Sequence, residues 1–344
     1  MQAIHIVVHG DPSVLRVVDL PAPEPAAGEV LVRVLATSVN HLDLWVRRGM
    51  PGVTIPLPRV PGCDGTGEVV ALGEGATGFE PGQKVVLLPG FSSGTSEHDR
   101  AGNDHLSDDY GIRGEHCDGF ARELVALEPR FLLPLPDGID PVPVAAVPLV
   151  FVTAWGLVVS RAQVRAGERV LVLGGASGVG SAAIQVARDA GARVIATAGS
   201  QEKRALAREL GADEVVDHGD PEWPRAVRAW SGGRGVDVVV EHVGPATWDG
   251  SVRCLARNGR LVTCGGTTGA KVGLVLPHLF IKNVSILGST MGPAGSFPAI
   301  FAKVAAGVFR PVVDRVLPLS RAAEAHRLLE ERAVLGKIVL APGS

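Results

Sequence analysis

The segment Leu171–Ala187 reads LVLGGASGVGSAAIQVA, and it decides the fold of this chain. A continuous apolar run, typical of a buried strand, leads into a cluster of glycines, and the cluster opens an amphipathic helix that ends on Gly191. Glycines let the backbone turn tightly and approach an anion, and the helix N-terminus offers free N–H groups and a positive dipole end. This order of strand, glycine turn and helix predicts a site for the phosphates of a dinucleotide.

The glycine turn matches the G-x-G-x-x-G pattern imperfectly. Gly175, Ser177 and Gly180 occupy the three key positions, and the serine hydroxyl at the central one can donate to a phosphate oxygen. A glycine-rich loop without a ligand is the alternative. It is disfavoured because strand, turn, helix and second strand all stand where a dinucleotide fold requires them. We predict cofactor contacts along the whole turn, from Gly175, Ala176, Ser177, Gly178, Val179 and Gly180.

The pattern around this turn indicates an α/β protein with two domains. From Ala166 onward, strand-like and helix-like segments alternate with short links, which is typical of a parallel sheet with helices on both faces. The first 130 residues are β-rich, and residues 89–115 form a long polar loop. The tail predicts one helix, with Ser320 as its N-cap, and one strand. A chain of 344 residues is long enough for two domains.

The end of the second strand bears on the choice of cofactor. NAD-specific folds place an acid there to hold the ribose hydroxyls, whereas this chain reads TAGSQEKR over residues 197–204. Gly199 and Ser200 leave a small pocket, and the cations Lys203 and Arg204 follow, which favours the 2′-phosphate of NADP(H). NAD(H) remains possible, and Lys203 on a solvated helix face is the alternative interpretation of that residue.

Composition excludes several functional classes. A net charge of −3, with one Tyr, nine Phe and five Trp, gives no basic or aromatic surface for nucleic acid or membranes. The apolar segment 142–159 contains Pro143 and Pro148, and we expect it to be a buried helix rather than a membrane span. Four dispersed cysteines without a CxxC pair, and an opening without signal-peptide character, predict a cytoplasmic protein.

The whole chain resembles the medium-chain dehydrogenase/reductase superfamily, which contains zinc alcohol dehydrogenases and zinc-free quinone reductases. The resemblance rests on PAPEPAAGEVLVRV, SVNHLDLWVRRG, PRVPGCDGTGEVVALG, FEPGQKVV, VPLVFVTAWGLV, GGASGVG and GKIVL, in matching order and spacing. It implies a GroES-like (chaperonin-10-like) β-rich catalytic domain from residues 1–147 and 292–344, and a Rossmann domain over 148–291. It also implies a homodimer or homotetramer, paired through the edge strand NVSILGST.

The resemblance also shows where zinc ligands would stand. The first catalytic ligand falls at Asn40, the histidine ligand at Cys63, its neighbouring Glu at Asp64, and the last ligand near Val150 or Phe151. The four cysteines of a structural zinc site correspond to Ser93, Ser96, Asp99 and Ser107. Zinc is therefore not expected. A remnant metal site built from Cys63 and Asp64 with His116 or Cys117 is the alternative.

The same resemblance assigns candidate site residues. Quinone-reductase-like members show an SVN-x-x-D segment, matched here by Asn40 and Asp43. Asn40 and His41 are expected to hydrogen-bond the nicotinamide ribose or the substrate oxygen, with His41 as a possible proton donor, and Asp43 to brace the loop. Cys63 and Asp64 line the former metal position. Further cofactor contacts are implied at Thr153, Val243, Gly244, Gly265, Gly266, Thr267, Ser289 and Lys337.

These inferences predict an oxidoreductase that transfers hydride between a nicotinamide cofactor and a small carbonyl, enone, quinone or alcohol, without zinc. Reduction of an activated acceptor is the favoured direction, because oxidising an alcohol without a metal needs a general base. Two alternatives stay open: a zinc-dependent alcohol dehydrogenase with a remnant metal site, and an NADPH-binding or redox-sensing protein with little turnover.

Overall fold

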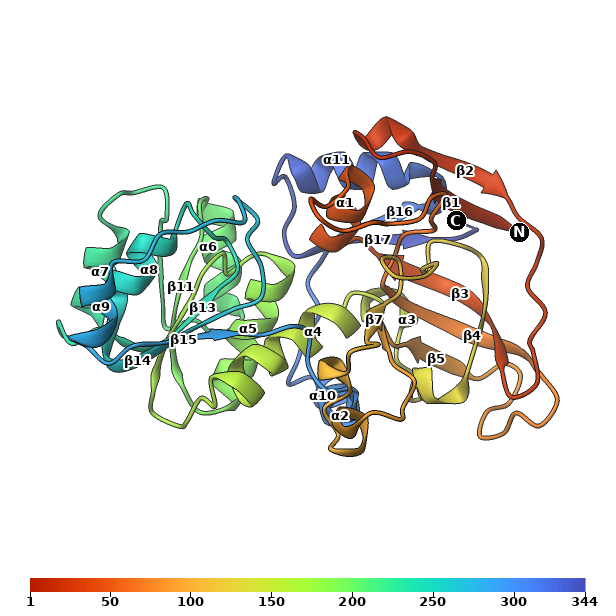
Figure 1. The fold of residues 1–344 in the computed structure, drawn as a ribbon, viewed down its shortest axis with the longest axis horizontal. Coiled ribbons are helices and arrows are strands. Elements are labelled where there is room, and N and C mark those ends of the chain that lie inside the picture. The colour runs from red at the N-terminus through yellow and green to blue at the C-terminus, as the bar shows by residue number, and fades with distance from the viewer. Residues whose placement is uncertain (344) are drawn as a thin grey trace. The chain divides into compact units, whose positions relative to one another are not determined.

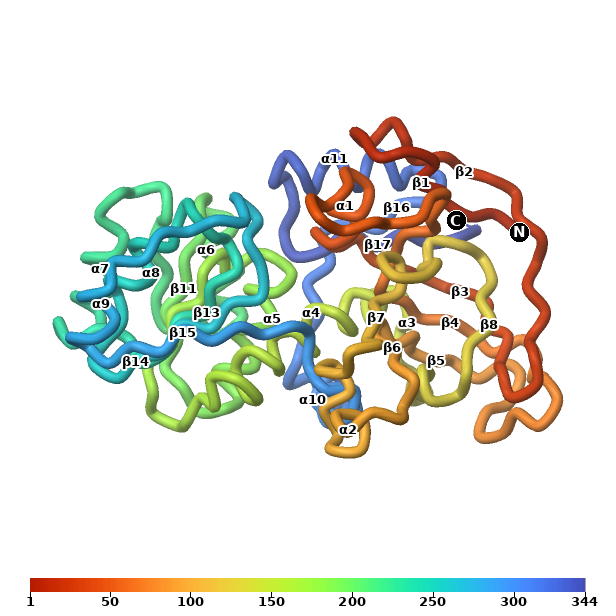
Figure 2. The backbone as a smooth tube through the Cα atoms, viewed as in Figure 1, coloured from red at the N-terminus to blue at the C-terminus, as the bar shows by residue number. Residues whose placement is uncertain are grey.

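The computed structural model describes residues 1–343 and divides them into two compact units (Figure 1). Unit 1 comprises residues 1–149 and the chain from Pro311 onward, so that both termini lie in it (Figure 2), and unit 2 comprises Val150–Arg310. The return to unit 1 comes at Pro311 rather than at 292. The reason is that Phe309 packs on Phe151, with ring centroids 5.3 Å apart, and the Arg310 N–H donates to Gln185 at 2.7 Å, all within unit 2.

Unit 2 is built on a six-stranded parallel sheet. Its strand order is β12-β11-β10-β13-β14-β15, and every neighbouring pair is parallel. The chain winds outward in one direction from β10 and in the other from β13, which is the doubly wound arrangement that the alternating sequence pattern predicts. The strands are β10 (Arg169–Val172), β11 (Arg193–Thr197), β12 (Glu214–Val216), β13 (Val236–Glu241), β14 (Leu255–Thr263) and β15 (Ser285–Gly288).

Helices cover both faces of this sheet. Figure 1 shows α7 and α8 on one side of the central strands and α5 on the other. Trp223 and Val227 of α7 and Trp248 of α8 are buried in one cluster with strand residues such as Leu171 and Val239, which fixes these two helices to the sheet. The helices are α4 (Pro148–Trp155), α5 (Gly178–Asp189), α6 (Gln201–Glu209), α7 (Trp223–Trp230), α8 (Trp248–Cys254), α9 (Leu276–Phe280) and α10 (Phe297–Ala305).

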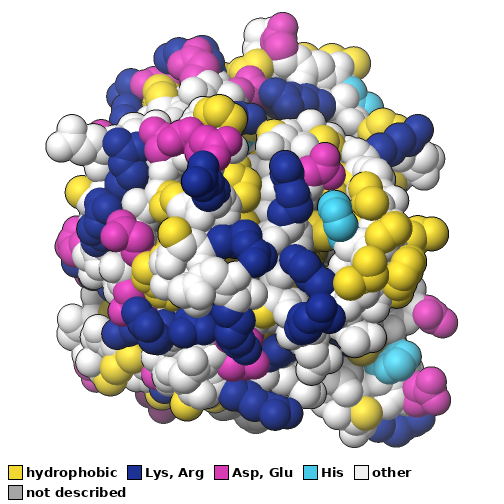
Figure 3. All heavy atoms as spheres, turned by 90° about the vertical axis from the view of Figure 1, so that its left-hand side faces the viewer, with side chains coloured by type: hydrophobic (Ala, Val, Ile, Leu, Met, Phe, Trp, Pro, Cys, Tyr) yellow, Lys and Arg dark blue, Asp and Glu magenta, His cyan; other side chains and the backbone are white. Residues whose placement is uncertain are grey.

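One edge of the unit 2 sheet is apolar at its surface. Strand β15 is the outermost strand beside β14, and the segment that precedes it carries six exposed large hydrophobic residues. Figure 3 shows hydrophobic side chains gathered into a patch on this end of the molecule, beside scattered Lys and Arg. The six residues, which we name the 272–281 apolar segment, are Val272, Leu274, Val275, Leu276, Phe280 and Ile281.

Unit 1 is built on a seven-stranded sheet that joins the two ends of the chain. Strands β16, β17, β3, β4, β5 and β9 follow one another, and β8 pairs with β3. Only β16 and β17 are parallel; the other pairs are antiparallel. The strands are β3 (Val30–Ser38), β4 (Asp64–Leu72), β5 (Lys84–Leu87), β8 (Leu124–Leu127), β9 (Leu132–Pro134), β16 (Val313–Pro318) and β17 (Lys337–Ala341), with the separate pairs β1 (Gln2–Ile6) and β2 (Leu15–Asp19), and β6 (Gly90–Phe91) and β7 (Gly111–Ile112).

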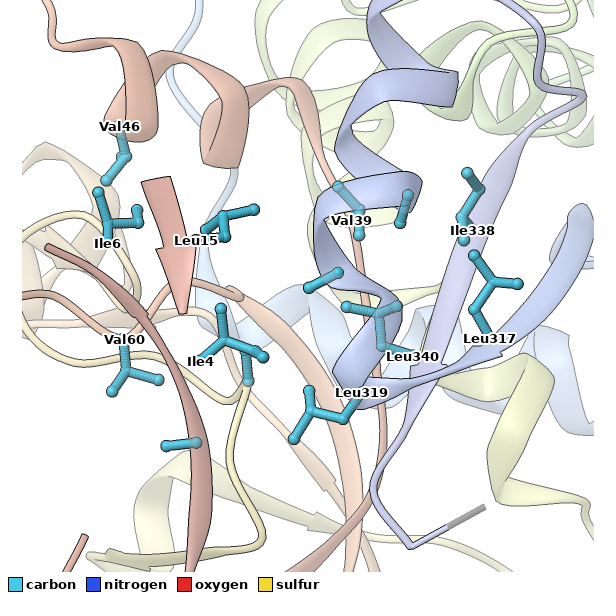
Figure 4. Packing of buried hydrophobic residues seen from close by; sticks show 14 of the residues in the cluster. Ile4, Ile6, Leu15, Val39, Val46, Val60, Leu317, Leu319, Ile338 and Leu340 are labelled. Atoms are coloured by element: carbon cyan, nitrogen blue, oxygen red, sulfur yellow. The ribbon is translucent and has the colours of Figure 1, made fainter. Parts of the chain in front are cut away.

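The main core of unit 1 combines residues from both chain ends. Figure 4 shows Ile4 on the side of Leu319 and Leu340, and Ile6 further along beside Leu15, all in one cluster. The helices of this unit are α1 (His41–Arg48), α2 (Glu97–Arg100), α3 (Pro141–Val144) and α11 (Ala322–Glu330). The expectation that Ser320 caps the last helix is wrong, because Ser320 lies inside a 3-10 turn, Leu319–Arg321, that precedes α11.

The apolar segment 142–159 is interrupted twice. It contains α3, α4 and the start of a π-helical turn, Gly156–Arg161. In residues 1–343, no helix combines the length and the apolar character that crossing a bilayer requires.

Candidate functional site

The glycine turn of unit 2 forms the N-terminus of α5, as predicted. Ser177 is the N-cap, and its hydroxyl oxygen accepts from the Gly180 N–H at 3.0 Å. Gly174 takes a φ of +57°, and a Cβ on Gly180 would lie only 2.1 Å from the Gly174 carbonyl oxygen. The turn is therefore tight because no side chain fits there. The capping role of Ser177 adds to the phosphate contact expected of it, since the hydroxyl accepts in the cap and keeps its own proton.

The end of β11 carries the residues expected to choose the cofactor. Ser200 caps α6, with its hydroxyl accepting from the Lys203 N–H at 3.2 Å, and no acid occupies residues 197–200. Arg204 is held by Asp217, with 2.7 Å between Nη1 and the carboxylate oxygen. Of the two cations that follow β11, Lys203 and Arg204, Arg204 is therefore the one engaged in an ion pair with Asp217.

The ends of β13 and β14 are joined to each other. The Thr267 hydroxyl donates to the His242 carbonyl at 2.8 Å, and a Cβ on Gly244 would stand 3.0 Å from the Gly269 carbonyl. Parallel strands end at the same edge of a sheet, so these loops share an edge with the glycine turn. The predicted residues Val243, Gly244, Gly265, Gly266, Thr267 and Ser289 all follow strands at this edge.

Sequence reasoning missed the residue that organises this edge. The carboxylate of Glu241 is completely buried at the end of β13 and accepts from the Val243 N–H at 2.7 Å, the Gly244 N–H at 3.0 Å and the Ser251 hydroxyl at 2.6 Å. The feature that could have identified Glu241 from the sequence is an acidic residue directly after the strand-like run VDVVV. Elsewhere in unit 2, Thr153 is 5% exposed and its hydroxyl lies 3.8 Å from the Met291 sulfur.

Unit 1 holds a buried polar cluster at the start of α1, and strand register creates it. Ser38 pairs with Asp64 on one side and with Val339 on the other, and the antiparallel register continued by two residues sets Lys337 opposite Asn40. All these side chains then point to one face of the sheet, because they lie two residues apart or directly across.

Hydrogen bonds tie this cluster together; we name Asn40, Asp64 and Lys337 the amide–carboxylate–ammonium cluster. One carboxylate oxygen of Asp64 accepts from Asn40 Nδ2 at 2.8 Å and from Lys337 Nζ at 3.1 Å, and the Ser38 hydroxyl donates to it at 2.8 Å. The other accepts from the Leu149 N–H at 2.6 Å. The Lys337 ammonium also donates to Asn40 Oδ1. The Lys337 ammonium therefore lies in this cluster of unit 1, and its contact with the cofactor stays a prediction.

Asp43 and Cys63 flank the cluster. The carboxylate of Asp43 accepts from the Asn40 N–H at 2.7 Å and from the Gly62 N–H at 2.8 Å, so it braces the start of α1 against the segment before Cys63. Burial raises the pKa of Asp43 to about 6, although these two N–H donors lower it in part. Burial also raises the pKa of the Cys63 thiol well above its usual value. Cys63 is thus a neutral thiol, 3.3 Å from Asn40 Nδ2.

His41 is the first residue of α1 and is half-buried. It lies beside Trp45, with ring centroids 6.5 Å apart. Of the residues that the sequence assigned to catalysis, the structure brings Asp43, Cys63 and Asp64 into contact with Asn40, and His41 follows Asn40 in the chain.

The positions of the zinc ligands carry other chemistry. In the lobe loop, the carboxylate of Asp99 accepts from the Ser92 hydroxyl at 2.6 Å and the Ser96 N–H at 2.9 Å, and Ser107 donates to Asp109 at 2.6 Å. Serine–aspartate hydrogen bonds therefore close this loop. Throughout residues 1–343, no three His, Cys, Asp or Glu side chains come together as a group able to hold a metal ion, the proposed remnant set included.

Comparison with known proteins agrees with this architecture. Residues 26–137 match the alcohol dehydrogenase GroES-like domain, and residues 178–306 match the zinc-binding dehydrogenase family. A zinc-type alcohol dehydrogenase-like protein of Schizosaccharomyces pombe is 33% identical over 91% of this chain and 90% of its own length. A quinone oxidoreductase of Pseudomonas aeruginosa is 32% identical over 98% of this chain and 99% of its own.

A solved structure described as an NAD-dependent alcohol dehydrogenase is similar along its whole length. It is 47% identical, covers 100% of both chains and superimposes with a TM-score of 0.97. Fold, glycine turn and these relatives together lead to one assignment. The chain belongs to the medium-chain dehydrogenase/reductase superfamily, as an oxidoreductase of the alcohol dehydrogenase and quinone oxidoreductase type.

Proposed function

We propose that this protein is a zinc-independent, NADP(H)-dependent reductase of activated carbonyl compounds such as quinones and enones. The amide–carboxylate–ammonium cluster carries the proposal. By the resemblance, its Asn40 stands at the position of the first catalytic zinc ligand and its Asp64 beside that of the second, and its polar groups hydrogen-bond one another.

Zinc does not fit the donor set of this cluster. The Asn40 amide oxygen already accepts from the Lys337 ammonium, and its Nδ2 directs protons towards Asp64 and Cys63. Catalytic zinc takes three protein ligands, whereas here the Cys63 sulfur accepts from Asn40 Nδ2 at 3.3 Å, and Ser38, Asn40 and Lys337 all donate to one carboxylate oxygen of Asp64. A second cation beside the ammonium would also be repelled.

The residues of unit 2 do fit a nicotinamide dinucleotide. The glycine turn at Ser177 and Gly180 offers N–H groups and space for a pyrophosphate, and such a cofactor supplies the hydride when bound. Ser200 and Lys203, with no acid at the end of β11, favour a 2′-phosphate there. NADH is the second candidate, supported by the NAD-dependent description of the 47% identical structure.

The chain's own residues divide the remaining work. The Asn40 amide already hydrogen-bonds Cys63, Asp64 and Lys337. We therefore assign it the positioning of α1 rather than contact with the substrate. His41, one residue later, then hydrogen-bonds the substrate oxygen and donates the proton that balances the transferred hydride. Quinones and enones suit this site, because a conjugated acceptor needs less help from a metal than an alcohol does. The quinone oxidoreductase of Pseudomonas aeruginosa supports the same substrate class.

The test is NADPH oxidation by chelator-treated protein with quinones, enones and aldehydes, and with NADH in parallel. We expect turnover of quinones or enones after chelation, and a fall in kcat of about 100-fold or more in His41→Asn. His98→Asn, at an exposed lobe residue, serves as the control. Activity restricted to alcohols and aldehydes and lost on chelation would establish the zinc-dependent alternative. Bound NADPH that no acceptor oxidises would establish the low-turnover binder.

A further inference from the structure

Three arginines of unit 1 converge on Cys117. Arg59 precedes Cys63, Arg113 follows β7, and Arg122 precedes β8. Burial raises the pKa of the Cys117 thiol, and the positive charges of Arg113, Arg59 and Arg122 lower it in part. All three guanidinium groups therefore lie within electrostatic range of one sulfur atom.

Backbone hydrogen bonds fix this convergence. The Gly119 N–H donates to the Val60 carbonyl at 2.7 Å, and the Phe120 N–H donates to the Gly62 carbonyl at 2.8 Å. These bonds hold the chain between Cys117 and Arg122 against the segment that begins with Arg59. Arg113 is further held between aromatic rings, at 4.9 Å from the Phe131 centroid and 5.3 Å from that of Phe91.

The three guanidinium groups have few acceptors among the described residues. The Nε atom of each is buried and has no hydrogen-bond partner among the described residues. Arg59 is 8% exposed, and its nearest carboxylate oxygen, on Asp118, lies 3.7 Å away and already accepts from the Val60 N–H at 2.9 Å.

The other two arginines are no better paired. Arg113 reaches only the Cys117 sulfur, at 3.9 Å. The side chain of Arg122 makes no hydrogen bond or ion pair within residues 1–343.

Such an arrangement is costly without a ligand. A buried charge is tolerated when it is paired and hydrogen-bonded, and here the three cations outnumber the carboxylates near them, Asp118 beside Arg59 and Arg122 and Glu128 near Arg113. Burial lowers the pKa values of Arg113 and Arg122, which reflects that cost. Guanidinium groups present planar pairs of N–H donors, and these match the oxygen atoms of phosphate, sulfate or carboxylate.

We propose that Arg59, Arg113 and Arg122 form a binding site for an oxyanion of the phosphate or sulfate class. The ligand supplies the acceptors and the negative charge that the protein leaves out. The site belongs to unit 1 alone, uses none of the residues assigned to hydride transfer, and does not depend on the proposed reaction.

The experiment is calorimetric titration of the full-length protein, saturated with NADPH so that the phosphate-binding groups of unit 2 are occupied, with inorganic phosphate and, separately, with sulfate, in a low-salt chloride buffer. We expect saturable binding of one anion per chain. Arg122→Met and Arg113→Met should each weaken it by about tenfold or more, because each removes charge-assisted hydrogen bonds. The control is Arg33→Met on β3, whose side chain is 57% exposed and lies 3.7 Å from Glu68.

Circular dichroism and NADPH binding by unit 2 verify that each variant is folded, and Arg122→Lys provides a milder variant should Arg122→Met not fold. Absence of saturable binding in the wild-type protein overturns the proposal. Equal affinity in the wild-type, Arg122 and Arg113 proteins overturns it too, since binding would then take place elsewhere. Neither result would touch the proposed hydride transfer, whose readout is NADPH oxidation.

Discussion

The Lys337 ammonium lies 3.1 Å from the Asp64 carboxylate, and both residues are nearly or completely buried. The pair joins the last strand of the chain to β4, so that the polar cluster exists only when the C-terminal segment has docked on β3. The cluster therefore forms from the N-terminal segment, which contributes Asn40 and Asp64, and from the C-terminal strand, which contributes Lys337.

Removing Lys337 should destabilise unit 1 strongly. Lys337→Met leaves the Asp64 carboxylate buried without its positive partner, and breaking a buried pair in this way costs about 3–5 kcal/mol of unfolding free energy. Urea denaturation followed by tryptophan fluorescence measures it. The control is Lys84→Met, at an exposed residue of β5 in the same sheet, with an expected change within about 0.5 kcal/mol. An equal free energy of unfolding in Lys337→Met and the wild-type protein would show that the Lys337–Asp64 pair does not stabilise unit 1.

The glycine turn offers a sharper steric test. A Cβ on Gly180 would stand 2.1 Å from the Gly174 carbonyl, which is backbone and cannot rotate away. Gly180→Ala should cost about 1–3 kcal/mol and abolish tight NADPH binding, because the turn must open. Gly295→Ala is the matched control, since a Cβ there meets nothing within 4 Å. NADPH fluorescence titration reports both variants, and unchanged affinity in Gly180→Ala would separate this turn from the cofactor.

Cofactor choice should depend on Lys203. If its ammonium meets the 2′-phosphate, Lys203→Ala raises the KM for NADPH by about tenfold and leaves the KM for NADH unchanged. Arg208→Ala on the same helix is the control, because Arg208 pairs with Glu214 at 2.9 Å. Initial rates with both cofactors decide the matter. A parallel change in both KM values would mean that Lys203 acts on the fold of α6 instead.

The sequence predicts features made by residues that are close along the chain better than features made by distant ones. The Rossmann unit is predictable, because its strand, turn and helix all lie within Leu171–Ala187. The polar cluster is not, because Lys337 reaches Asn40 only through the pairing of β17 with β3, which no local pattern encodes. The return of the chain to unit 1 at Pro311 has the same kind of origin, because the Phe309–Phe151 contact that precedes it spans most of unit 2.

The lobe loop should respond to acid through Asp99. Hydrogen bonds from Ser92 and Ser96 lower the pKa of Asp99 to about 2, from 3.8. A depressed carboxyl stabilises the folded state above its unfolded pKa, so this contribution is complete above pH 3.8 and is lost as the pH falls through about 2. Asp99→Asn should weaken that pH dependence and leave the part that comes from Asp109, whose pKa is lowered by hydrogen bonds from Ser107 and Ser93. The rate of pepsin cleavage within residues 89–115 between pH 4 and pH 2 measures it.

A second aspartate of the same loop, Asp108, provides the control. Asp108 is exposed in the same loop, and Asp108→Asn should cleave with the wild-type pH profile. If Asp99→Asn also keeps that profile, the serine–aspartate hydrogen bonds do not hold the loop closed.

The sheet of unit 2 has two edge strands, β12 and β15, and we expect a second copy of the chain to pair with β15. Strand β15 has a neighbour on one side only, and the 272–281 apolar segment before it keeps Leu276 64% exposed and Phe280 66% exposed. Unpaired strand edges and contiguous apolar patches are features of association surfaces. Light scattering after size exclusion should therefore give a mass of two or four chains of 35.7 kDa each.

Charges placed in this segment should separate the subunits. Leu276→Glu combined with Phe280→Glu buries two carboxylates in the expected interface, which shifts the population towards the mass of one chain. Val8→Glu is the matched control, because Val8 is a 55% exposed hydrophobic residue of unit 1, and it should leave the mass unchanged. A wild-type protein that elutes as a single chain, or a double variant that stays assembled, would direct the search for the interface away from β15.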